Sequence, residues 1–117
     1  MGECNACMHC IVAAPTAGAC GVLPAVLLPY GRRYELPDDT LIKALYVASG
    51  FGAVIAQRAS ISGAEAGCQA EIGTAAAMAA AALVYLHGGS AVQMANAAAM
   101  ALKNMMGLVC DPVAGLV

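Results

Sequence analysis

The chain has 117 residues and a formal net charge of −2; 62% of its residues are hydrophobic and 10% are charged. This composition excludes intrinsic disorder, which requires low hydrophobicity and high net charge. It also argues against a nucleic-acid partner, because the sequence has no basic stripe and no row of aromatic residues that would hold a phosphate backbone. One small domain, or part of a larger one, is expected at this length.

The mean hydropathy of +0.78 predicts that lipid or other protein covers much of the chain. A membrane span requires about 20 predominantly apolar residues, and the best uninterrupted run, residues 75–86, is shorter than that. Residues 41–55 are interrupted by Lys43, and the N-terminus shows no secretory signal. We therefore expect a cytoplasmic protein without membrane contact, whose six cysteines are thiols or metal ligands.

The first third of the chain shows few helix signals. The segment to Ala13 is rich in cysteine, and residues 14–29 combine three prolines with two glycines, which is typical of a loop with short helical pieces. Residues 31–40 form the one strongly hydrophilic stretch. We expect this stretch to be an exposed loop, because charged residues are rarely buried.

Three helices are predicted after this loop. Apolar residues recur at helical spacing over residues 40–57. Ser62 and Glu65 have the spacing of a capping box, which predicts a second helix from about Ser62 to His87. Ser90 and Gln93 repeat that spacing before residues 91–106, and Gly107 suits the left-handed residue that closes a helix.

The predicted fold class is therefore all-α, built from buried Ala/Gly-rich helices. The second helix is apolar on nearly every face and contains Gly67 and Gly73, so it needs neighbours on several sides. A chain of this length supplies few such neighbours. We expect residues 1–117 to be a piece of a larger protein, truncated at its C-terminus, and to associate through exposed apolar helix faces.

Two groups of cysteines are candidates for chemistry. Cys4, Cys7 and Cys10 have the C-x-x-C-x-x-C spacing that opens the bacterial ferredoxin pattern, although Ala14 stands at its fourth cysteine position. With Cys20 as a substitute, these residues would suit a small iron–sulfur electron carrier. The structural alternative is a helical segment whose thiols share one packed face.

The second group is Cys68 with Cys110, in the segments SGAEAGCQAE and GLVCDPVAGLV. Together with APTAGACGVLPAVL at residues 14–27, these motifs resemble the α subunit, or α domain, of the iron–sulfur-dependent bacterial L-serine dehydratases. The resemblance runs from about residue 5 onward. It implies that residues 1–117 are a partial catalytic α domain of an L-serine ammonia-lyase, which converts L-serine to pyruvate and ammonia.

The resemblance further implies a [4Fe-4S] cluster held by three cysteines, with the fourth iron open to substrate. Two of the ligands correspond to Cys68 and Cys110, and the third is expected in a Val-Pro-Cys stretch beyond Val117. Cys4, Cys7, Cys10 and Cys20 stand where the family does not require cysteine. The family also implies a β subunit or β domain, which carries the histidine expected to act as base, and a homo-oligomer.

Three residues of the signature loops are candidates for substrate contacts: Thr16, Ser62 and Glu65. For Ser62 and Glu65 the capping box is a sufficient structural explanation. His9 and His87 are the only histidines, and His87 has a capping explanation at the end of its helix, so the catalytic base stays unassigned. The functional alternatives are a relative of the L-cysteine desulfidases, the small electron carrier, and a helical interaction module with inert buried thiols.

Overall fold

Helices account for all the regular secondary structure in residues 2–107, which are the residues that the computed structural model describes. No strand occurs within these residues, which confirms the all-α prediction. The helices, in chain order, are α1 (Gly2–Ala6), α2 (Val22–Arg33), α3 (Asp38–Arg58), α4 (Gly63–Ala66), α5 (Cys68–Leu86) and α6 (Ala91–Met105).

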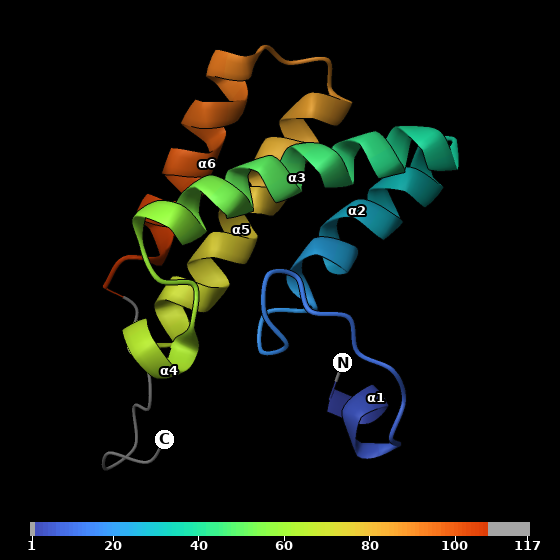
Figure 1. The fold of residues 1–117 in the computed structure, drawn as a ribbon. Coiled ribbons are helices and arrows are strands. Elements are labelled where there is room, and N and C mark those ends of the chain that lie inside the picture. Colours follow the sequence, from blue (N-terminus) through green and yellow to red (C-terminus); the bar gives the residue numbers. More distant parts are fainter. Residues whose placement is uncertain (1, 108–117) are drawn as a thin grey trace.

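Helix α5 is the centre of the bundle. It packs against α2, α3 and α6, and α4 lies next to its first turn. Figure 1 shows α3 crossing α5, while α6 returns along α5. Alanine and glycine make up most of its buried residues, which lie on several sides of the helix, as expected for a helix that is apolar all round: Gly73, Thr74, Ala75, Ala77, Met78, Ala79, Ala81 and Ala82.

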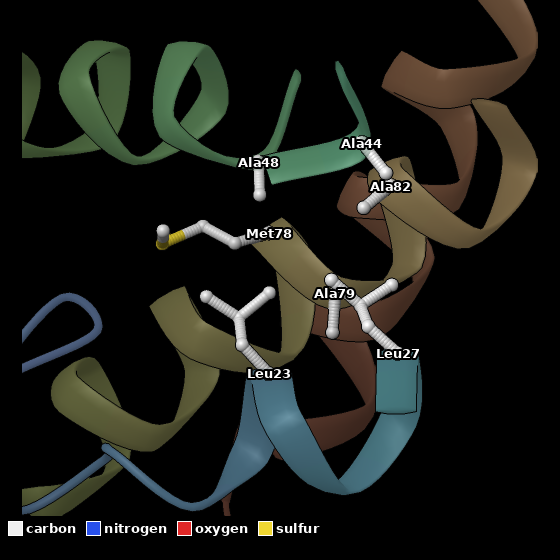
Figure 2. Packing of buried hydrophobic residues seen from close by; sticks show 7 residues of the cluster. All are labelled: Leu23, Leu27, Ala44, Ala48, Met78, Ala79 and Ala82. Carbon is white, nitrogen blue, oxygen red and sulfur yellow. The ribbon is translucent and has the colours of Figure 1, made fainter. Parts of the chain in front are cut away.

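The main core cluster lies where α2 and α3 meet α5. Figure 2 shows Met78 of α5 between Ala48 of α3 and Leu23 of α2, with Ala44 and Leu27 beside the alanines of the following turn of α5. Small residues allow this close approach: a Cβ on Gly52 of α3 would lie 2.8 Å from the Met78 sulfur. The cluster comprises Leu23, Leu27, Ala44, Ala48, Met78, Ala79 and Ala82.

Helix α2 corrects part of the prediction of a loop with short helical pieces over residues 14–29: residues 14–21 are loop, but residues 22–29 belong to one helix of 12 residues. Pro24 is the third residue of α2, where a backbone N–H has no partner within the helix, so proline costs little there. Pro29 lies inside the helix and removes one backbone hydrogen bond. Leu23 and Leu27 are buried against α5, and this tertiary packing outweighs the local preference for a loop.

The hydrophilic stretch at residues 31–40 is a loop only at its centre. Its first three residues complete α2 and its last three begin α3, so the connection comprises residues 34–37. Arg32 and Arg33 occupy the last turn of α2, and Asp38 and Asp39 the first turn of α3. Basic residues stabilise the C-terminal end of a helix and acidic residues its N-terminal end, because each charge is opposite to that end of the helix dipole. Most of the stretch is exposed, but the predicted loop of ten residues is wrong.

The helix predicted from Ser62 to His87 is interrupted at Gly67. The φ and ψ angles of Gly67 are +85° and 159°, a backbone region that is open almost exclusively to glycine. Two helices result, and Cys68 becomes the first residue of α5.

The prediction of α6 is confirmed, including its cap. The Gln93 backbone N–H donates to Ser90 Oγ at 3.4 Å, and the Ser90 N–H donates to Gln93 Oε1 at 2.8 Å. Gly107 has a φ of +82°, as expected for a residue that closes a helix. Helix α3 also forms as predicted, and it begins two residues earlier.

Two helices, α3 and α5, are long and apolar enough to cross a membrane by length and composition alone. The expectation that no segment reaches this length is therefore wrong, because both helices extend beyond their uninterrupted apolar runs. Helix α5 is packed against three other helices, which is the environment of a core helix.

Candidate functional site

The start of α5 holds Cys68 and lies next to α4 and the loop before α2. Cys68 is the first residue of α5, and Glu71 follows three positions later, so their side chains lie on neighbouring positions of one helix face. Helix α4 directly precedes this turn in the sequence. The loop before α2, which is distant in the sequence, contacts the same turn through Thr16. Figure 1 shows α4 and this loop near the same end of α5.

A hydrogen bond ties the loop before α2 to α5. Thr16 Oγ1 donates to Glu71 Oε2 at 2.5 Å, between residues 55 positions apart in the sequence. Both side chains are half-buried. This contact places Thr16 next to the first turn of α5, and its role in substrate binding stays a prediction.

Two glycines border the Glu71 carboxylate. A Cβ on Gly18 would overlap Glu71 Oε1, and a Cβ on Gly63 would lie 3.2 Å from the same oxygen. Gly18 belongs to the loop before α2, and Gly63 is the first residue of α4. The carboxylate is therefore enclosed by backbone from two segments, and a side chain at either position would displace it.

Ser62 and Glu65 do not form the predicted capping box. The Ser62 side chain makes no capping hydrogen bond, and Glu65 Oε2 instead accepts from Ser60 Oγ at 2.6 Å. The Ser62 backbone N–H donates to Ser60 Oγ at 3.1 Å. The Ser60 hydroxyl thus lies between Glu65 and the Ser62 N–H, the two groups that a capping box would bond directly to each other. These three residues line one open hollow at the start of α4.

Cys68 presents an exposed thiol at this end of α5. The neighbouring position is open, since a Cβ on Gly67 would meet nothing within 4 Å. A thiol is the ligand that iron–sulfur clusters use, so the donor chemistry of Cys68 fits such a group. Cys110 lies outside the described residues, and residues 2–107 by themselves contain no group of three His, Cys, Asp or Glu residues that would hold a metal.

The N-terminal cysteines are arranged differently from either prediction. Helix α1 ends at Ala6, and Cys4, Cys7 and Cys10 are all exposed, so they form no packed helix face. Cys20 is buried at the start of α2. Among the described residues these four cysteines form no metal-binding group, and the structure therefore gives no support to the electron-carrier alternative.

His87 lies at the wrong end of α5 to act at this site. It follows Leu86, and a helix of this length places it about 28 Å from Cys68. Its ring packs edge-on against Tyr30, with 5.2 Å between the ring centroids. His9 is exposed in the segment after α1. His87 thus has a structural explanation, as its position at the helix end predicts.

Glu71 is the site residue that the sequence interpretation missed. It is the only charged residue in α5, and a single carboxylate in a long Ala-rich helix is costly to bury unless something pairs with it. A lone glutamate in an otherwise apolar helix was therefore the sequence feature that could have indicated Glu71 as a site residue. Its partner, Thr16, was not predictable from local spacing.

Comparison with known proteins matches the whole chain to one family. The family model described as serine dehydratase alpha chain matches residues 1–117. The probable L-serine dehydratase alpha chains of Bacillus subtilis and Latilactobacillus sakei are 53% and 52% identical to it over 98% of this chain. The L-serine dehydratase alpha chain of Peptoniphilus asaccharolyticus is 50% identical, also over 98% of this chain.

The chain spans 38%, 55% and 39% of the lengths of these three relatives, respectively. No solved structure matches it.

Proposed function

This chain belongs to the serine dehydratase alpha-chain family, and from that premise we propose that it carries part of the active site of a cytoplasmic L-serine ammonia-lyase. The observation that carries the proposal is the meeting of three motif segments around Glu71. Thr16 comes from the loop before α2, Gly63 from α4, and Cys68 from the start of α5. Residues far apart in the sequence are thereby assembled at one end of the bundle.

We propose Cys68 and Cys110 as two ligands of a [4Fe-4S] cluster, with the third cysteine beyond Val117. Cys68 is suited to this role because its thiol is exposed next to an open position. When bound, such a cluster supplies a Lewis acid that makes the β-hydroxyl of L-serine a better leaving group. Thr16, Ser62 and Glu65 are the proposed substrate contacts on this chain.

The reaction also needs a base that removes the α-proton of L-serine. Loss of the α-proton and of the β-hydroxyl, as water, leaves an enamine, which tautomerises to an imine and is hydrolysed to pyruvate and ammonia. His87 is distant from Cys68, and His9 is exposed beyond α1. We therefore assign the base to the β subunit or β domain, and we expect the complete enzyme to be a homo-oligomer.

The test is turnover by the full-length protein with its β portion, reconstituted with iron and sulfide under anaerobic conditions. Pyruvate formation from L-serine is measured together with the visible absorption of the cluster. Cys68→Ala is expected to abolish both signals, because each thiolate is a structural ligand of the cluster. Cys7→Ala is the matched control, since Cys7 is also an exposed thiol, and it should retain both.

Cluster absorption that survives Cys68→Ala but is lost in Cys7→Ala would favour the electron carrier. L-cysteine turnover in preference to L-serine would favour a desulfidase-type relative.

A further inference from the structure

The direction of the Thr16 hydrogen bond determines what this hydroxyl offers to a ligand. A threonine hydroxyl has one proton to donate and two lone pairs to accept with. The proton is donated to Glu71 Oε2. Toward a ligand, Thr16 Oγ1 is therefore an acceptor only, and it suits a group that brings hydrogen-bond donors.

The Glu71 carboxylate has acceptor capacity left over. An ionised carboxylate offers about four acceptor positions, and in the described part of the chain Thr16 is its one side-chain donor. No ion pair involves Glu71 within residues 2–107, and the basic side chains are exposed on other helices: Arg32, Arg33, Lys43, Arg58 and Lys103. A half-buried carboxylate without a cation favours a ligand that supplies one.

The pair is placed where a ligand can reach it. Thr16 and Glu71 are half-buried rather than sealed in the core. Open hollows lie in the adjoining segments: one is lined by Ala17 and Gly18, which follow Thr16 in the sequence, and another by Arg58, Ser62 and Glu65. Glu71 also shares its helix face with Cys68, so a ligand held here lies beside the exposed thiol.

We propose that Thr16 and Glu71 together bind the α-ammonium group of the substrate. An ammonium brings a positive charge and three N–H donors, which match one carboxylate and one acceptor-only hydroxyl. The inference rests on the proposed function and narrows it: the site selects molecules with a free α-ammonium group. The absence of a side chain at Gly18 and Gly63 leaves room for the carboxylate in this position.

The test uses the holoenzyme and two inhibitors, L-alanine and propionate, which differ only in the α-ammonium group. The wild-type protein should bind L-alanine at least about 10-fold more tightly than propionate, because a hydrogen bond to a charged group contributes that much. Glu71→Gln should remove most of this preference and raise the KM for L-serine about 10- to 100-fold with a much smaller change in kcat.

Matched variants separate binding from a general loss of structure. Thr16→Val should also weaken L-alanine binding, whereas Thr16→Ser keeps the hydroxyl and should stay close to wild type. Glu35→Gln removes the same charge from the exposed connection after α2 and should leave the preference intact. Circular dichroism and cluster absorption check that each variant is folded and loaded.

The outcomes for the two proposals are distinct. Glu71→Gln protein that keeps both the L-alanine preference and the wild-type KM overturns the ammonium site. Equal affinity of wild-type protein for L-alanine and propionate also overturns it. Absence of L-serine turnover in the loaded wild-type protein instead contradicts the proposed function, and the inhibitor preference is then still measured directly by calorimetry.

Discussion

Thr16 and Glu71 are joined by a 2.5 Å hydrogen bond across 55 positions of sequence, and this bond fastens the loop before α2 to the first turn of α5. In the described residues it is the one side-chain hydrogen bond that links two segments this far apart. The bond adds to the burial of Ala19 and Cys20 in holding this loop against the bundle.

Removing the Thr16 hydroxyl should destabilise the protein as well as the site. Thr16→Val leaves a half-buried carboxylate without its donor, which is expected to cost about 1–3 kcal/mol. Thr16→Ser retains the donor and should cost clearly less. The free energy of unfolding is measured by urea denaturation of the full-length protein. Equal losses in both variants would show that methyl packing, rather than the hydrogen bond, is responsible.

Gly18 should tolerate no side chain while Glu71 is in place. Gly18→Ala puts a Cβ where the carboxylate lies. The Glu71 side chain must then move away and lose its hydrogen bond with Thr16, which is expected to cost about 1–3 kcal/mol. Gly50→Ala is the control, because a Cβ there meets nothing within 4 Å. Inside α3 that change should stabilise the helix by about 0.5–1 kcal/mol.

A double-mutant cycle isolates the contact between Gly18 and Glu71. In a Glu71→Ala background the space next to Gly18 is vacant, so Gly18→Ala should lose most of its destabilising effect. If Gly18→Ala lowers the free energy of unfolding equally in the Glu71→Ala background, its Cβ must clash with another part of the loop and not with Glu71.

The two serines at helix starts should behave differently on truncation. Ser90 forms a complete capping box at α6, so Ser90→Ala is expected to destabilise by about 1 kcal/mol. The Ser62 side chain makes no such bond, and Ser62→Ala should change unfolding much less. A loss at Ser62 equal to that at Ser90 would indicate that the sequence pattern, not the observed geometry, describes α4.

Local sequence signals were sufficient to predict three helices. They were insufficient where contacts between distant residues determine the secondary structure. Helices α3 and α6 were predictable from apolar spacing and caps, and most of α5 from its Ala-rich run. Helix α2 was not, because packing of Leu23 and Leu27 against α5 overrides its prolines. The resemblance placed Thr16 and Cys68 in one family site, and the structure brings both to the start of α5.

The remaining features of the site lie beyond a local pattern. The Thr16–Glu71 contact joins the loop before α2 to α5, and no spacing rule connects residues that far apart. Ser62 and Glu65 matched a capping box in sequence, but Ser60 competes for the glutamate. The pairing of Cys68 with Cys110 stays a prediction, because Cys110 lies outside the described residues.

Gly67 offers the sharpest test of the break before Cys68. Its φ and ψ of +85° and 159° are nearly inaccessible to other residues, so Gly67→Ala should cost about 1–3 kcal/mol. A Cβ would meet no neighbouring atom, which means that the cost comes from the backbone alone. Relief of this strain favours a continuous helix through residues 63–86, as the Ala-rich sequence predicts.

That rearrangement would turn Cys68 out of its position at the start of α5. We therefore expect Gly67→Ala protein to bind less iron and to lose cluster absorption, although every cysteine is retained. Iron content and visible absorption are measured after anaerobic reconstitution, with Gly50→Ala as the control for a glycine in open space. Full iron loading in the Gly67→Ala protein, together with lower folding stability, would show that Cys68 holds its place without the glycine break.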